Sequence, residues 1–441
     1  MRAVVLHPAT RDDGGAPSAA GILPETLPPE ARLEEAIGLA QAIDLEIASS
    51  GTVRLTRPRP STLFGPGKVE ELKGLIEAEN AGLVIVDHAL TPVQQRNLEK
   101  AWGAKVLDRT GLILEIFGAR ARTKEGRLQV ELAHLLYQRS RLVRSWTHLE
   151  RQRGGYGFLG GPGETQIEAD RRVIGERIDA IRKDLAAVRR TRKLHRENRQ
   201  RTPFSTVALA GYTNAGKSSL FNAMTKANVH AEDQLFATLD PTMRRLELPS
   251  GVAIISDTVG FISELPTTLV AAFRATLEEV SEADLILHVR DIAAPFSQRQ
   301  KQEVEGVLSE LGVDVESADG KILEVWNKID LLDAESRESL AAQARRMERE
   351  PVLVSAHTGE GISELRRRIA EHLARDHVVR TFDLTSGEGA LVHWLYRHGD
   401  VRDREDCEDG HTRIEVRLTQ ADLKRFEYML DKSASDAATE S

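Results

Sequence analysis

The segment from Gly211 to Ser218 has the residue types and spacing of a loop that binds phosphate. Its sequence matches G-x-x-x-x-G-K-[ST], and it lies between an apolar run that predicts a strand and a segment that predicts a helix. Backbone N–H groups and the helix N-terminus would face the phosphates, Lys217 would reach the β- and γ-phosphates, and Ser218 would hold Mg²⁺. The residues expected to bind phosphate are Gly211, Tyr212, Thr213, Asn214, Ala215, Gly216, Lys217 and Ser218.

Three further motifs follow apolar runs that read as strands, in the order expected of a GTP-binding domain. The carboxylate of the first would join the Mg²⁺ shell, and its glycine N–H would meet the γ-phosphate. The second ends in a carboxylate that would accept two N–H groups from guanine, which adenine does not offer, so GTP is favoured over ATP. The third would contact the guanine carbonyl through backbone N–H groups. The motifs are Asp257, Thr258, Val259 and Gly260, then Asn327, Lys328, Ile329 and Asp330, and finally Ser355, Ala356 and His357.

A switch segment is expected between the phosphate loop and Asp257. Within it, Thr238 is the natural second hydroxyl ligand of Mg²⁺, beside Ser218. Ras-like enzymes place a glutamine directly after the Asp-x-x-Gly motif to orient the attacking water, whereas this chain has Phe261. The catalytic group is therefore unassigned: either hydrolysis is slow until a partner or another residue supplies it, or Phe261 merely packs. The switch residues are Phe236, Ala237, Thr238, Leu239 and Asp240.

Composition sets broad limits on the class of protein. The chain has 441 residues, a hydrophobic content of 41% and a formal net charge of −8, which is typical of a globular protein with several domains. No apolar stretch approaches the about 18 residues that a membrane span needs. The single cysteine, Cys407, excludes an internal disulfide framework and a cysteine-based metal site. We expect a cytoplasmic monomer.

The chain divides into segments with different patterns. Residues 1–126 alternate strand and helix signals and predict a small α/β domain; residues 202–375 predict the GTPase domain; residues 376–432 predict a small C-terminal α/β domain, with acidic residues gathered at 400–409; and residues 433–441 are expected to be disordered. The fold class is therefore α/β. Gly65-Pro-Gly67-Lys68 opens a predicted helix, and either an anion site or a plain Gly-Pro turn explains it.

Residues 127–201 predict an antiparallel hairpin of two amphipathic helices. Leucines from Leu128 onward and isoleucines from Ile174 onward recur at alternate three- and four-residue steps. The link between the helices, residues 154–163, contains six glycines and predicts a flexible tip with Tyr156 and Phe158. A basic rod with such a tip suits structured RNA, and the alternative is a solvated coiled coil. The basic residues are Arg139, Arg141, Arg144, Arg151, Arg153, Arg171 and Arg172 near the tip, and Arg189, Arg190, Arg192, Lys193, Arg196, Arg199 and Arg201 toward the base.

The glycine-rich segment and the residues after it resemble the signature of the HflX family of translational GTPases. The resemblance rests on Gly160-Gly-Pro-Gly163-Glu164, Thr165-Gln166-Ile-Glu168 and Asp170-Arg171-Arg172, and the nucleotide motifs are similar as well. It implies a cytoplasmic GTPase that binds the large ribosomal subunit and its rRNA, splits ribosomes stalled under stress such as heat, and binds ATP through its N-terminal part with RNA-unwinding activity. The alternatives are a GTPase of ribosome assembly and one that serves RNA modification.

Overall fold

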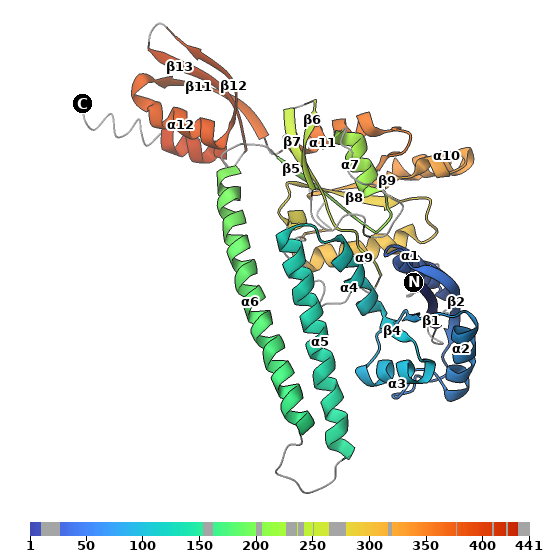
Figure 1. Cartoon of the computed structure of the whole chain (residues 1–441). Coiled ribbons are helices and arrows are strands. Elements are labelled where there is room, and N and C mark those ends of the chain that lie inside the picture. The colour runs from blue at the N-terminus through green and yellow to red at the C-terminus, as the bar shows by residue number, and fades with distance from the viewer. Residues whose placement is uncertain are drawn as a thin grey trace.

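The computed structural model describes residues 1–9, 27–152, 162–199, 205–225, 236, 242–249, 251–263, 279–315, 320–375, 377–407, 410–419 and 422–430. These residues form three β-sheets with their helices, joined by a long helical hairpin (Figure 1), which confirms the expected α/β class. No helix within the described ranges is long and apolar enough to cross a bilayer.

The N-terminal domain is a parallel sheet between two layers of helices. Strand order is β2-β1-β3-β4, and neighbouring side chains of β1 point to opposite faces. Val4 packs with α2 and α3, whereas Val5 packs with α1 and α4. The sequence pattern indicated all of the elements given below except β4 and α4. The elements are β1 (Arg2–Ala9), α1 (Pro29–Gln41), β2 (Glu46–Arg54), α2 (Pro66–Ala78), β3 (Leu83–Val86), α3 (Pro92–Trp102), β4 (Lys105–Asp108) and α4 (Arg109–Arg120).

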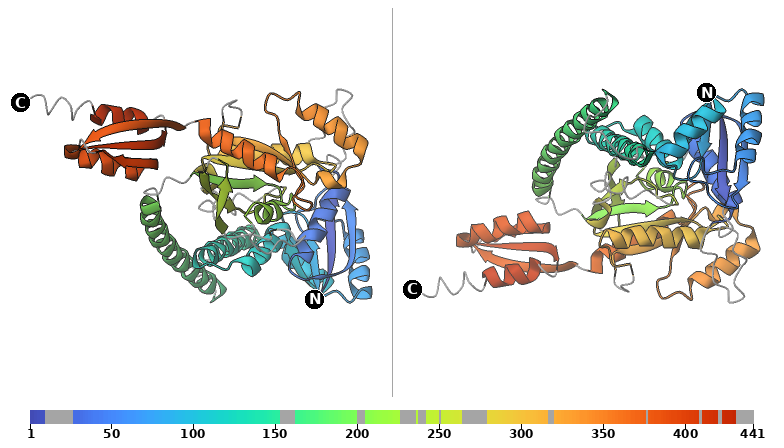
Figure 2. Two further views of the ribbon diagram at one scale, coloured as in Figure 1. Left: turned by 90° about the horizontal axis from the view of Figure 1, so that it is seen from above. Right: turned by 90° about the horizontal axis from the view of Figure 1, so that it is seen from below.

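Helices α5 (Lys124–Gln152) and α6 (Pro162–Arg199) lie side by side, and their far ends project beyond the sheets (Figures 1 and 2). At about 1.5 Å per residue, the 38 residues of α6 span about 57 Å. Ile178, Ile181 and Leu185 are buried, as the apolar spacing predicts. One expectation is wrong. Pro162 and Gly163 belong to α6 rather than to the loop, because proline suits the first helical turn. Residues 154–161, with Tyr156 and Phe158, lie outside the described ranges.

Helix α5 has a second buried face that the sequence pattern did not predict. Val130 and Ala133 are fully buried against the N-terminal domain. We expected Arg141 on the basic surface near the tip, and this expectation is wrong. Its guanidinium forms an ion pair with Asp108 and lies 4.2 Å from the ring centroid of Tyr137. Arg141 therefore anchors the hairpin to the N-terminal domain.

The GTPase domain is a six-stranded sheet of order β10-β9-β8-β5-β7-β6, in which β6 alone is antiparallel. Leu209 on β5 faces α7 and α11, and its neighbour Ala210 faces α9. The parallel strands place the loops that follow them at one edge of the sheet. The elements are β5 (Thr206–Gly211), α7 (Lys217–Thr225), β6 (Thr242–Leu248), β7 (Gly251–Asp257), β8 (Leu285–Asp291), α9 (Ser297–Glu310), β9 (Ile322–Asn327), η2 (Ile329–Leu331), α10 (Ala334–Ala344), β10 (Val352–Leu353) and α11 (Ile362–Arg375).

The C-terminal domain is an antiparallel sheet of order β11-β13-β12, and its helices pack on one face around Phe426. The acidic segment that begins at residue 400 is a strand, which the sequence pattern did not indicate because its charges leave almost no apolar alternation. Residues 433–441 lie outside the described ranges. The elements are β11 (His377–Thr385), η3 (Ser386–Glu388), α12 (Gly389–His398), β12 (Asp400–Asp406), β13 (His411–Thr419) and a helical segment, 422–430.

Candidate functional site

The phosphate loop runs from the end of β5 to the start of α7, and both of its glycines are required sterically. Gly211 has φ +154°, and a Cβ there would lie 2.2 Å from the carbonyl oxygen of Val289. Gly216 has φ +86°, and its Cβ would lie 2.3 Å from Asn327 Nδ2. Only glycine accommodates both the backbone angle and the close contact at these positions.

Lys217 lies under this loop with its ammonium turned back on the backbone. Its Nζ donates to the carbonyl oxygens of Gly211 (3.1 Å) and Tyr212 (2.7 Å). An ammonium has three N–H donors, so one remains for a phosphate oxygen. Burial lowers the pKa of Lys217 to about 8, although the charge of Asp257 acts to raise it. Phosphate charge beside Lys217 would restore the protonated form.

Ser218 and Asp257 meet where a divalent cation would be expected. The Ser218 Oγ donates to the Asp257 Oδ2 at 2.7 Å, and Asp257 is fully buried at the end of β7. A hydroxyl and a carboxylate oxygen are ligands that Mg²⁺ accepts, together with water and substrate phosphates. The donor set therefore fits the predicted cation. Thr238, the second predicted ligand, lies outside the described residues with Ala237, Leu239 and Asp240.

Asn327 joins the phosphate loop to the predicted base-reading loops. Its Nδ2 donates to the carbonyl oxygen of Ala215 (2.8 Å), and its Oδ1 accepts from the backbone N–H of Ala356 (3.0 Å). Lys328 has φ +65° and forms an ion pair with Asp291 (2.9 Å), and its Cε would lie 4.0 Å from a Cβ on Gly216 of the loop. The structure therefore brings the loop, Asn327 and Ala356 together.

The acceptor and donor groups for guanine lie beside Asn327. Asp330 is half-buried in η2 and makes no hydrogen bond or ion pair with the described residues, so its carboxylate is available for the base. The backbone N–H of Ser355 donates to the carbonyl oxygen of Glu360 (2.9 Å), and that of Ala356 is used by Asn327. Of this predicted trio, His357 keeps a backbone N–H without a partner in the described part of the chain.

Phe261 packs in the interior of the GTPase domain. Its side chain is 3% exposed and belongs to the apolar cluster with Ala208 and Ala210. Its backbone pairs with the phosphate loop: the N–H of Thr213 donates to the Phe261 carbonyl oxygen (2.7 Å), and the Phe261 N–H donates to that of Gly211 (3.1 Å). The sequence left open whether Phe261 has only a packing role, and the buried side chain fits that role.

Three functional candidates carry no motif that the sequence pattern could reveal: Glu35, Arg109 and Ser263. They form hydrogen bonds that connect the N-terminal domain to Tyr212 of the phosphate loop. A glutamate and an arginine on separate helices carry no sequence signal for such a role. Only the tertiary structure reveals it.

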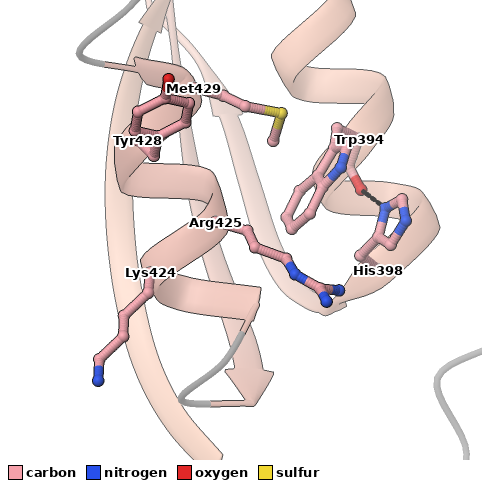
Figure 3. A pocket seen from close by; sticks show the side chains of 6 residues that line it. All are labelled: Trp394, His398, Lys424, Arg425, Tyr428 and Met429. Carbon is pink, nitrogen blue, oxygen red and sulfur yellow. Dashed lines mark hydrogen bonds between the residues drawn. The ribbon is translucent and has the colours of Figure 1, made fainter.

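Two other places have features of a ligand site. At the start of α2, a Cβ on Gly65 or Gly67 would meet nothing within 4 Å, and Lys68 pairs with Glu71 (2.6 Å). These contacts describe a helix start rather than a phosphate cradle. The C-terminal domain has an open pocket of about 400 Å³ between α12 and the 422–430 helix (Figure 3), and none of its lining residues belongs to a nucleotide motif. It is lined by Trp394, His398, Lys424, Arg425, Tyr428 and Met429.

The phosphate loop, the Ser218–Asp257 pair and the Asn327 bridge are the features of a P-loop GTPase site. Four family models match the chain along its length: "GTP-binding GTPase N-terminal" over residues 30–118, "GTP-binding GTPase Middle Region" over 120–199, "50S ribosome-binding GTPase" over 206–328 and "HflX C-terminal domain" over 339–440.

Curated relatives agree with this assignment. The GTPase HflX of Magnetococcus marinus is 52% identical over 400 residues, which cover 90% of each chain. The GTPase HflX of Escherichia coli is 44% identical over 398 residues, which cover 89% of this chain and 91% of the relative. The chain therefore belongs to the HflX family of GTPases. A GTP-binding protein from Sulfolobus solfataricus, solved with GDP, is 22% identical with a TM-score of 0.45, over 85% of this chain and 99% of that one.

Proposed function

We propose that this GTPase binds the large ribosomal subunit through the α5–α6 hairpin and splits or rescues stalled ribosomes under stress. GTP would fix two switch segments, the first around Thr238 and the second around Gly260, and would favour ribosome binding; hydrolysis would release both segments. Mg²⁺ would be held by Ser218 and Thr238, and Asp257 would accept a hydrogen bond from Ser218. The cation would neutralise phosphate charge during hydrolysis. ATP binding by the N-terminal part, with RNA remodelling, remains a prediction.

The observation that carries this proposal is the charge and shape of the hairpin. Residues 127–201 contain 18 lysine and arginine residues and nine aspartate and glutamate residues, although the whole chain has a net charge of −8. The excess of basic over acidic residues therefore lies in one long rod, which connects the N-terminal domain to the GTPase domain in the chain (Figure 1). Phosphate contacts by such a rod are sequence-independent and weaken with salt.

Sedimentation of ribosomes tests the proposal. Arg171 and Arg172 are exposed near the start of α6, so changing both to glutamine removes two charges without disturbing a core. Arg345 and Arg346, also adjacent and exposed, lie at the end of α10 and provide a matched control pair. With a non-hydrolysable GTP analogue, the R171Q/R172Q protein should bind large subunits more weakly. Its binding should also depend less steeply on salt, because each arginine that meets a phosphate contributes roughly one unit to the slope of log affinity against log salt concentration.

The R345Q/R346Q control should behave like the parent. Equal weakening of binding in both double variants would mean that net charge, and not the hairpin, determines ribosome binding. Parallel runs with intact ribosomes and with subunit precursors separate splitting from a role in assembly. Release of subunits from intact ribosomes supports the proposal, and association with precursors alone favours the assembly alternative.

A further inference from the structure

The nucleotide switches pack directly on the N-terminal domain. Phe236 of the first switch segment, and Val259 and Ile262 of the second, belong to the same apolar cluster as residues of α1, α4 and α5. The ring of Phe236 meets that of Phe117 edge-on, with centroids 4.8 Å apart. Movement of either switch segment therefore changes its packing on the N-terminal domain.

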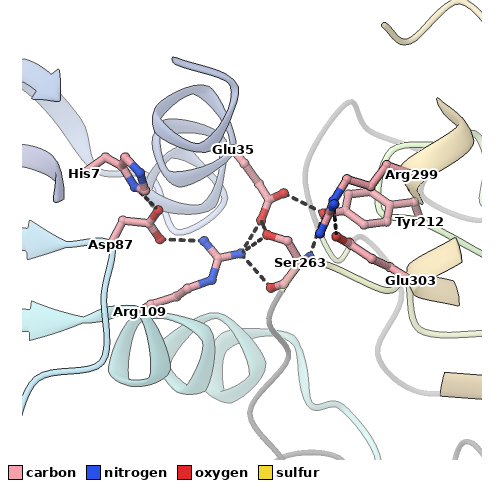
Figure 4. Close-up of polar contacts among 8 residues, drawn as sticks. All are labelled: His7, Glu35, Asp87, Arg109, Tyr212, Ser263, Arg299 and Glu303. Carbon is pink, nitrogen blue, oxygen red and sulfur yellow. Dashed lines mark hydrogen bonds and ion pairs between the residues drawn. The ribbon is translucent and has the colours of Figure 1, made fainter. Parts of the chain in front are cut away.

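A polar clamp adjoins these apolar contacts; it consists of Glu35, Arg109, Tyr212 and Ser263 (Figure 4). Tyr212, the second residue of the phosphate loop, donates its hydroxyl proton to Glu35 Oε2 at 2.6 Å. Ser263 Oγ donates to Glu35 Oε1 at 2.8 Å, and the backbone N–H of Ser263 donates to the Tyr212 hydroxyl at 2.6 Å. One carboxylate of the N-terminal domain thus holds the phosphate loop and the second switch segment together.

Arg109 fixes the clamp to the interior of the N-terminal domain. Its Nη2 donates to the carbonyl oxygen and to the Oγ of Ser263, both at 2.9 Å, and it also pairs with Glu35. Its Nη1 donates to Asp87 Oδ1 at 2.5 Å, and Asp87 in turn meets His7 Nδ1 at 2.8 Å. Burial alone would lower the pKa of Arg109, but the charges of Asp87 and Glu35 raise it, so the guanidinium stays charged.

The described part of the second switch segment lies against the phosphate loop at Gly260 and against the clamp at Ser263. A Cβ on Gly260 would lie 2.9 Å from Lys217 Nζ and 2.8 Å from Thr213 Cγ2, so the glycine backbone covers the buried ammonium. Three residues later, Ser263 is held by the clamp. A terminal phosphate must lie against both Lys217 and the N–H of Gly260. A terminal phosphate that enters between Lys217 and Gly260 would displace Gly260 from the phosphate loop.

We propose that Glu35 and Arg109 are specificity-determining residues of the nucleotide site, which favour GDP over GTP by opposing this movement of Gly260. The diphosphate makes no contact with the second switch segment and leaves the clamp intact. The triphosphate displaces the segment and strains the clamp. This coupling is reciprocal. If GTP promotes movement of the N-terminal domain away from the second switch segment, a partner that causes the same movement raises the affinity for GTP by the same factor.

Affinities for GDP and for a non-hydrolysable GTP analogue, measured by calorimetry in the presence of Mg²⁺, test the proposal. Ser263→Ala removes the hydroxyl that Glu35 and Arg109 share, and Glu35→Gln removes the charge. The control is Glu34→Gln, because Glu34 is the exposed neighbour on the same helix. The affinity for the analogue relative to that for GDP should rise by roughly tenfold in each variant, because both substitutions remove charge-assisted hydrogen bonds of the clamp. Glu34→Gln should leave the ratio unchanged.

The ratio of the two affinities separates this role from a structural one. Variants that merely loosen the interface would weaken both nucleotides in parallel, which would overturn the proposal, as would a shift of the ratio toward GDP. Ser263→Ala removes a single oxygen, so it keeps the test valid if Glu35→Gln lowers the melting temperature. The proposal depends on the GTPase site and not on ribosome binding, so failure of the sedimentation experiment leaves it standing.

Discussion

Nucleotide affinity should fall at alkaline pH because Lys217 loses its proton. Lys217 is 6% exposed, and burial lowers its pKa from 10.5 to about 8 despite the opposing effect of Asp257. The phosphates of a bound nucleotide stabilise the charged form and raise this pKa again. The protonated protein is therefore the form that binds, and binding near pH 8 takes up protons from solution.

The size of the effect follows from that pKa. With a free-state pKa of about 8, the ammonium is protonated in roughly nine tenths of the molecules at pH 7, about a quarter at pH 8.5 and about a tenth at pH 9. The affinity for GDP should therefore fall about fourfold from pH 7 to pH 8.5 and about tenfold by pH 9, and about half a proton should be taken up per GDP at pH 8.

Calorimetry at pH 8 in two buffers of different ionisation enthalpy measures the proton uptake directly. The same measurement at pH 7 is the control, because Lys217 is already protonated in roughly nine tenths of the molecules there and about a tenth of a proton should be taken up. Equal proton uptake at pH 7 and pH 8, or an affinity that stays flat up to pH 9, would refute the reasoning.

Two further substitutions test the base-reading loop and the phosphate loop. Asp330→Asn should lower the preference for GTP over XTP by roughly tenfold or more, because one charged acceptor is removed; competition between the two nucleotides measures it, and an unchanged preference would show that Asp330 does not read the base. Gly216→Ala should abolish nucleotide binding and lower stability by about 1–3 kcal/mol, because its Cβ would lie 2.3 Å from Asn327 Nδ2; normal GDP binding and melting would contradict the close packing.

The sequence was sufficient for the parts of the site that are local. The phosphate loop is a strand, a turn and a helix in succession, and its residue spacing is recognisable in the sequence alone. Asn327 and Asp257 could be placed because both follow buried strands of a parallel sheet, whose ends meet at one edge. These predictions needed no knowledge of how domains pack.

The contacts between domains could not be predicted in the same way. Glu35 lies 177 residues from Tyr212, and Arg109 lies 154 residues from Ser263. Each is a charged residue on a helix, where solvent exposure is the ordinary expectation. Arg141 was misplaced for the same reason, because only the packing of α5 on the N-terminal domain gives it a buried partner in Asp108.

The residues from Asp257 to Ser263 are continuous in sequence but lie in three different environments. Asp257 and Gly260 face the phosphate loop, Phe261 fills the interior of the GTPase domain, and Ser263 is bound by the N-terminal domain. Phe261 is buried and paired through its backbone with Gly211 and Thr213, so a displacement of Gly260 reaches Ser263 only if these hydrogen bonds also break. Substitutions before Phe261 should therefore alter phosphate binding itself, whereas those after it should alter how the N-terminal domain responds to the nucleotide.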